Sequence, residues 1–130
     1  MLVLTAFETN EISVIGTSEE WTQFGNWLEA ANSEYPLRVT NDVATWDDCL
    51  KTLRVECRPA GPVLIRSLPQ GVLAIEGSPE ALHILAENAR EMVAVQTDDH
   101  VHVDAAILPD VISETSAVMT WSRCEGRRSA

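Results

Sequence analysis

Two stretches of the chain repeat one pattern and decide the fold: residues 1–28, MLVLTAFETNEISVIGTSEEWTQFGNWL, and residues 62–89, PVLIRSLPQGVLAIEGSPEALHILAENA. They align at a spacing of 61 residues. The pairs at this spacing include Gly16 with Gly77, Thr17 with Ser78, Glu19 with Glu80, and Phe24 with Leu85. Each copy predicts a strand, a tight turn, a second strand, a glycine and then a helix.

Turn residues separate the predicted strands, and capping residues begin the predicted helices. Residue types that tolerate turn conformations stand at 8–10 and 69–71. Thr17 is followed by a glutamate at the spacing of a capping box, and Ser78 precedes Pro79, which suits a first helical position. Apolar residues at helical spacing predict the buried sides: Trp21, Phe24, Leu28 and Ala31, then Leu82, Leu85, Ala86, Ala89 and Val93.

The remaining segments predict further strands joined by loops. Strands are expected at residues 52–57, 100–104 and 117–121, with 37–39 as a further candidate, and loops at 40–48 and 107–115. We predict an α+β fold with a mostly antiparallel sheet of about six or seven strands and two helices on one face.

The domain organisation follows from the repeat. Residues 1–124 are expected to form a single domain of two pseudo-repeated strand-strand-helix halves, residues 1–61 and 62–124. A flexible tail is expected at residues 125–130.

Charge is spread unevenly along the chain. The net charge of the 130 residues is −11, and residues 1–48 carry nine acidic residues against one base, which gives −8 of that total. Nucleic acid is an unsuitable ligand, because binding it requires clustered lysine and arginine. A basic protein is a suitable partner, because an acidic surface attracts it over a distance. The alternative is a solvated surface that keeps the protein soluble.

Cysteine usage and hydropathy indicate the compartment. Cys49, Cys57 and Cys124 form no C-x-x-C pair, as expected for reduced thiols. No apolar run approaches the roughly 20 residues needed to span a membrane. The first residues lack a basic leader. We therefore expect a cytoplasmic protein with no membrane partner.

Acidic side chains and one tryptophan form the candidate partner-binding set. Trp46 stands in a polar loop beside two acids, and tryptophan is enriched at the energetic centres of protein interfaces. Partial burial as a lid on the sheet is the alternative for this side chain. The candidate partner-binding residues are Glu19, Glu20, Asp42, Trp46, Asp47 and Asp48.

A strand with two histidines is the candidate metal site. His100, His102 and Asp104 alternate with apolar residues, so they share one face of a strand, and two imidazoles with a carboxylate can bind Zn or Fe. The alternative is the polar side of an ordinary strand, because neighbouring side chains on one face lie about 7 Å apart.

Signatures of catalysis are weak. The glycines before the two helices lack the lysine of a phosphate-binding loop, and no serine lies in a G-x-S-x-G turn. We therefore expect no enzymatic activity and no cofactor.

The second half resembles immunity protein 32 of bacterial polymorphic toxin systems. The residues that carry the resemblance are Gly77, Ser78, Glu80, Ala81 and Leu82, then His100, His102 and Asp104, then Ser116 and the strand to Trp121. The segment from Gly16 to Trp21 is similar to the start of related proteins from high-GC bacteria, and the similarity covers residues 10–123. The resemblance implies a cytoplasmic protein that binds a cognate toxin and blocks it without catalysis.

Three functional hypotheses follow. The first is an immunity or antitoxin-like protein that binds a basic toxin through the acidic set. The second is a metal-binding enzyme or sensor built on His100, His102 and Asp104. The third is a homodimeric structural module that pairs exposed sheet edges.

Overall fold

Both repeats form the predicted strand-strand-helix order. The computed structural model describes residues 1–30, 32–97 and 99–124, so Ala31 and the tail at 125–130 lie outside the described residues. The first half contains β1 (Leu2–Ala6), β2 (Glu11–Gly16), α1 (Ser18–Glu29), β3 (Ser33–Pro36), β4 (Asp48–Cys49) and β5 (Thr52–Cys57). The second contains β6 (Leu64–Leu68), β7 (Val72–Gly77), α2 (Pro79–Glu91), the short 3-10 helix η1 (Met92–Ala94), β8 (His100–Val103) and β9 (Val118–Arg123).

Local signals in the sequence fix the hairpins and the helix starts. Asn10 and Gln70 adopt positive φ angles of 55° and 69° in the two turns. Thr17 accepts a hydrogen bond from the Glu20 N–H while the Glu20 side chain accepts one from the Thr17 N–H, which completes the predicted capping box. Ser78 caps α2 by accepting from the third helical N–H. These predictions are confirmed.

The described strands form two mixed sheets in which most pairs are antiparallel as predicted, whereas the prediction was of one sheet of about six or seven strands. Five strands lie in the order β4-β1-β2-β9-β8, and four lie in the order β3-β5-β7-β6. The central pairs, β2 with β9 and β5 with β7, are parallel, whereas the outer pairs are antiparallel. The α+β class is confirmed. The sheet count was wrong because an alternating pattern identifies a strand without identifying its partner.

Each hairpin pairs with a strand from the other half of the chain. The β1–β2 hairpin extends through β9 to β8, and the β6–β7 hairpin extends through β5 to β3. The registers correspond as well: Glu11 faces Val118, and Val72 faces Thr52 in the other parallel pair. The two halves are therefore related by an approximate two-fold axis and exchange their last strands.

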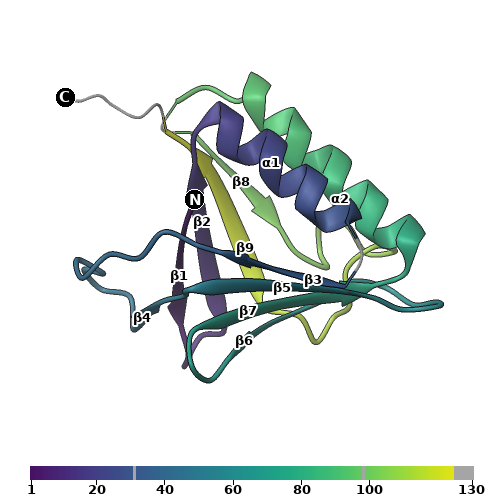
Figure 1. Cartoon of the computed structure of the whole chain (residues 1–130), viewed down its shortest axis with the longest axis horizontal. Coiled ribbons are helices and arrows are strands. Elements are labelled where there is room, and N and C mark those ends of the chain that lie inside the picture. The colour runs from purple at the N-terminus through teal and green to yellow at the C-terminus, as the bar shows by residue number, and fades with distance from the viewer. Residues whose placement is uncertain (31, 98, 125–130) are drawn as a thin grey trace.

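Both helices lie together on one side of the sheets and cover the core (Figure 1). Trp21, Phe24 and Trp121 meet there, with ring centroids 4.9 to 5.8 Å apart, and all three are fully buried. The Trp21 indole N–H donates to the Ser122 carbonyl at 2.9 Å, so its polar group is satisfied. Val93, predicted in the apolar stripe of α2, is 45% exposed because the α-helix ends before it.

Further backbone segments cover the outer sides of two strands. The Leu50 N–H donates to the Val3 carbonyl on β1, and the Ala117 N–H donates to the Ile65 carbonyl on β6. Residues 37–39, a candidate strand, contribute an isolated bridge to β1 instead, and β3 precedes them. The sheets of the described chain therefore end at β8 and β3 on their other sides. No helix in the described ranges is long and apolar enough to cross a membrane.

The helices approach closely at Gly25, which is buried in α1. A Cβ atom at this position would lie 2.9 Å from the carbonyl oxygen of Ala86 and 2.9 Å from Cγ of Arg90. Glycine in a helix costs about 1 kcal/mol relative to alanine. The close contact of the helices is the physical reason for a glycine here.

We predict that Gly25→Ala lowers the free energy of unfolding by about 1 to 3 kcal/mol, because the new methyl group overpacks against backbone. Urea denaturation measures this change. Gln23→Ala, at an exposed position of the same helix, is the control and should stay within about 0.5 kcal/mol of the parent. An equally stable or stabilised Gly25→Ala protein would contradict the packing account.

Candidate protein-binding surface

The acidic loop is fixed to the turn between β1 and β2. The Asp47 N–H donates to the Thr5 carbonyl at 2.9 Å, and the Asp47 carboxylate accepts from the Phe7 N–H at 2.8 Å. Asp48 and Cys49 then form β4, which pairs with β1. Asp48 is half-buried, and its carboxylate accepts from the Cys49 N–H at 2.8 Å. Loop and turn therefore present one preformed surface.

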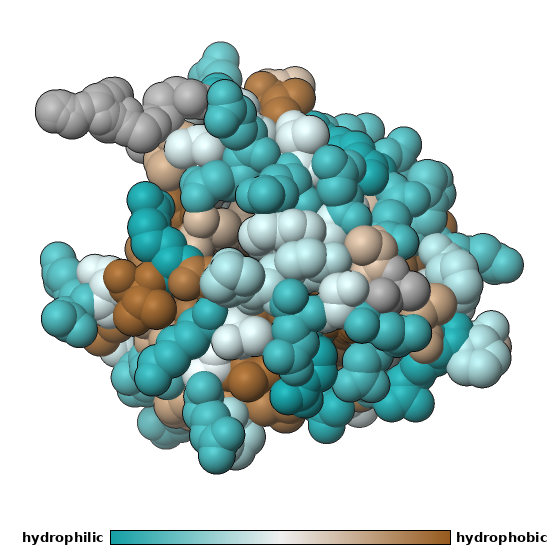
Figure 2. Space-filling model, in the orientation of Figure 1, coloured by the Kyte–Doolittle hydropathy of each residue, from teal (hydrophilic) through white to brown (hydrophobic). Residues whose placement is uncertain are grey.

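This surface combines exposed apolar side chains with acids. Phe7 is 55% exposed and Val39 is 53% exposed. Trp46 is half-buried. Figure 2 shows apolar side chains among hydrophilic ones on the side where this loop projects. We name the following residues the loop–hairpin surface: Phe7, Glu8, Val39, Asp42, Trp46 and Asp47.

The backbone of the loop is held in a strained conformation. Ala44 has a φ angle of 52°, in the left-handed region that favours glycine. A side chain at such an angle costs about 1 kcal/mol or more. The turn is closed by the Trp46 N–H, which donates to the Val43 carbonyl at 2.9 Å. Strain of this kind is concentrated at functional sites in proteins.

Two members of the predicted acidic set lie elsewhere and differ in role. Glu19 is exposed on the first turn of α1. Glu20 caps α1 and also binds the amino-terminal ammonium of Met1. Burial opposes ionisation of Glu20, but hydrogen bonds from that ammonium and from the Thr17 N–H outweigh it and hold the pKa of Glu20 below its ordinary value of 4.5. The structure thus brings the loop residues together, whereas Glu20 stabilises the start of α1.

The strand predicted to bind a metal is present, but the Asp104 carboxylate accepts hydrogen bonds from the turn that follows it. The rings of His100 and His102 lie 5.2 Å apart on β8. The Asp104 carboxylate accepts from the N–H groups of Ala106 and Ile107, at 2.9 and 3.1 Å, and closes a turn. Within residues 1–30, 32–97 and 99–124, no group of three or more His, Cys, Asp or Glu side chains is placed to hold a metal ion.

A buried carboxylate was not singled out from the sequence. Glu76 is 5% exposed, and it accepts a hydrogen bond from Arg58 at 2.7 Å, with Arg66 at 3.7 Å. The hydrogen bond and the charge of Glu76 raise the pKa of Arg58. The signal was a glutamate inside the otherwise apolar strand at residues 72–77. These partners satisfy the buried charge, so we assign Glu76 to the fold.

An ionic network joins the outer sides of the helices. Glu29 of α1 accepts from His83, at 3.0 Å, and from Arg90 of α2. These hydrogen bonds, that from His83 first, hold the pKa of Glu29 below its ordinary value. Arg90 also contacts Glu87 and Asn26. The network links the exposed sides of the two helices.

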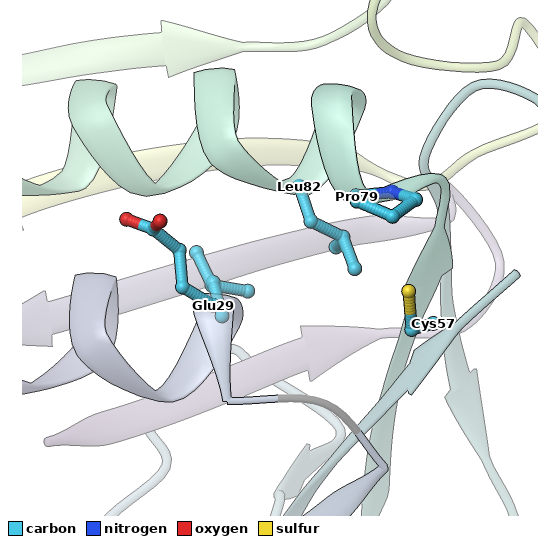
Figure 3. Close-up of a pocket in the computed structure, with 5 residues that line it drawn as sticks. Glu29, Cys57, Pro79 and Leu82 are labelled. Atoms are coloured by element: carbon cyan, nitrogen blue, oxygen red, sulfur yellow. The ribbon is translucent and has the colours of Figure 1, made fainter.

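One pocket lies between the end of α1, the start of α2 and the end of β5. It has a volume of about 240 Å³ and is lined by Leu28, Glu29, Cys57, Pro79 and Leu82. In Figure 3 the Cys57 thiol points toward α2, and the Glu29 carboxylate points away from the thiol. Glu29 is bound by α2 and is not placed to accept a proton from Cys57.

Comparison with known proteins adds no relative. No family model, curated protein or solved structure matches the chain. The function is therefore argued from the residues of this chain.

The lowered pKa of Glu20 predicts a pH-dependent contribution to stability. Because the folded-state pKa lies below 4.5, the contribution is present above that pH and is lost as pH falls through the folded-state value. Glu20→Gln keeps an acceptor for the Thr17 N–H and removes the charge. We expect it to lower the free energy of unfolding by about 1 kcal/mol at pH 7, and by progressively less as pH falls below 4.5 through the folded-state pKa.

Denaturation of both proteins between pH 3 and 7 measures the difference. Glu19→Gln, on the same helical turn but exposed, is the control. A destabilisation by Glu20→Gln that is the same at every pH would show that charge has no part in it.

Proposed function

We propose that this chain is an immunity-type protein that binds and neutralises a cognate, basic toxin protein in the cytoplasm. The observation that carries the proposal is the loop–hairpin surface, in which the Asp47 carboxylate accepts from the N–H of the exposed Phe7. Exposed apolar side chains with a polar rim mark protein-binding sites. In this proposal the protein acts by occupying the toxin, with no reaction of its own.

Acidic and apolar side chains of this surface would contribute to binding in different ways. Its acids, with the −8 charge of residues 1–48, would attract a basic partner and accelerate association. Phe7, Val39 and Trp46 would be covered in the complex and slow its dissociation. The bonds from Asp47 to β1 and to Phe7 already hold the loop in place, so little ordering accompanies binding.

The resemblance to immunity protein 32 supports the same class of function. It covers residues 10–123, which include the loop–hairpin surface apart from Phe7 and Glu8. A net charge of −11 opposes nucleic acid as the ligand.

Co-expression tests the toxin-neutralising function directly. The reading frame beside this gene would be expressed alone and together with the protein, and cell growth would be followed. We expect growth arrest by the neighbour alone and normal growth when both are present. A harmless neighbour, or arrest that persists in the presence of the protein, would count against the proposal.

Substitutions in the loop–hairpin surface should affect the kinetics of the complex in two ways. Phe7→Ala with Val39→Ala is expected to raise the Kd by about 10- to 30-fold, mainly through faster dissociation. Asp42→Asn with Asp47→Asn is expected to slow association by about 10-fold at low salt and to weaken its salt dependence. Surface plasmon resonance measures both rate constants.

Matched controls lie on the loop between β8 and β9. Ile107→Ala removes an apolar side chain that is 59% exposed, and Glu114→Gln removes an exposed charge. Both should leave the rate constants unchanged. Unchanged kinetics in the Phe7, Val39, Asp42 and Asp47 variants would place the interface elsewhere.

A further inference from the structure

The internal repeat allows one half of the molecule to be compared with the other. Between α1 and β3, the ring of Trp27 stacks on Tyr35, with centroids 4.6 Å apart and planes 11° from parallel. Asn88 stands 61 residues after Trp27 in the second helix. Val103 faces the second residue of β9, as Tyr35 faces the second residue of β5. Two large rings in the first half therefore correspond to two smaller side chains in the second.

The space that the rings fill in the first half is a cavity in the second. It has a volume of about 120 Å³, and the side chains that line it include Asn88, Met92, Val95, Val101, Val103 and Trp121. A cavity of roughly 150 Å³ with apolar walls accepts benzene. This cavity is therefore close to the size of one aromatic ring, and most of its lining is apolar.

The cavity adjoins an open edge of a sheet. β8 is the last strand of the five-stranded sheet of the described chain and lies beneath α2 (Figure 1). His100, Val101 and His102 are all exposed. An edge strand offers N–H and C=O groups to an added strand. Side chains directly opposite each other share one face, so a residue facing Val101 would lie on the face that lines the cavity.

Exposed acids near the cavity favour a basic partner, and Arg123, which lies beside it, is bound by the Val95 carbonyl and the Ser18 hydroxyl. Glu91 is exposed and lines the cavity, and Asp99 is exposed just before β8. Asp104 follows β8. A second copy of the chain fits poorly, because its own β8 carries no aromatic ring apart from imidazoles and each copy has a net charge of −11.

We propose that β8 and this cavity form a strand-addition site for an extended basic segment of a partner protein. One aromatic side chain of that segment would occupy the cavity, in the place that Trp27 and Tyr35 fill in the first half. The site goes beyond the proposed function. It lies at the edge of the sheet opposite β4 and the loop–hairpin surface, and it does not depend on the partner being a toxin.

A synthetic peptide tests the proposal on the whole protein. The probe has about nine residues: a central phenylalanine, threonines on both sides and a lysine at each end. Backbone NMR of the labelled protein would follow the titration. We expect saturable shifts at the amides of His100–Val103, and an affinity at least about 10-fold lower when alanine replaces the phenylalanine of the peptide.

Variants of the protein separate the cavity from the strand edge. Asn88→Trp places in α2 the side chain that α1 has at the matching position, and it should weaken peptide binding at least about 10-fold. Val101→Lys changes an exposed residue of β8 and should also weaken peptide binding, because it places a charge on the strand edge. It provides a second test if Asn88→Trp folds poorly. Ile84→Trp, exposed on α2 outside the cavity lining, is the matched control and should bind normally.

Methylation of alternate peptide nitrogens tests backbone pairing. Loss of binding in only one of the two alternating patterns is the result expected for strand addition. Equal binding by both methylated peptides, unchanged binding to Asn88→Trp and Val101→Lys, or shifts confined to the loop–hairpin surface would each overturn the proposal. So would shifts at β8 that depend on protein concentration without peptide, because they indicate a second copy at this edge. These outcomes are separate from the co-expression test, which involves no peptide.

Discussion

Parallel pairing of β2 with β9, and of β5 with β7, is the constraint on which the rest of the structure depends. Each pairing joins the two halves of the chain at the centre of a sheet. Neither hairpin builds its own sheet, so residues 1–61 and 62–124 are repeats in sequence whose strands alternate in space. The helices approach closely at Gly25, and Trp121 of the exchanged strand β9 packs against Trp21 of α1.

Sequence reasoning succeeded where the determining contacts are local. The capping box joins Thr17 and Glu20 within one turn of helix, and the hairpin turns depend on adjacent residues such as Asn10. The parallel pairing could not be predicted in this way, because Glu11 and Val118 lie far apart in the chain and alternation carries no information about partners. β3 was missed because residues 33–36, SEYP, show no run of β-forming residues.

For the candidate site too, the sequence predicted some features and the folded contacts were needed for the others. Composition located the acidic loop, and the structure added the bonds from Asp47 that fix it beside Phe7, an apolar residue with no signal of exposure in the sequence. Glu20 was grouped with that loop because it is acidic. Its partner, the ammonium of Met1, meets it only when β1 and β2 form a hairpin. A charge pattern thus predicts a surface, whereas the role of each carboxylate depends on contacts made by the fold.

The two halves share one backbone arrangement but carry different side chains at matching positions. Position for position, Ile15 of β2 corresponds to the buried, ion-paired Glu76 of β7, and Trp27 corresponds to Asn88 beside the cavity. In the first half stacked rings fill the space between α1 and β3, whereas the matching space between α2 and β8 is open. This asymmetry within a symmetric backbone is the physical basis for expecting binding at β8 rather than at β3.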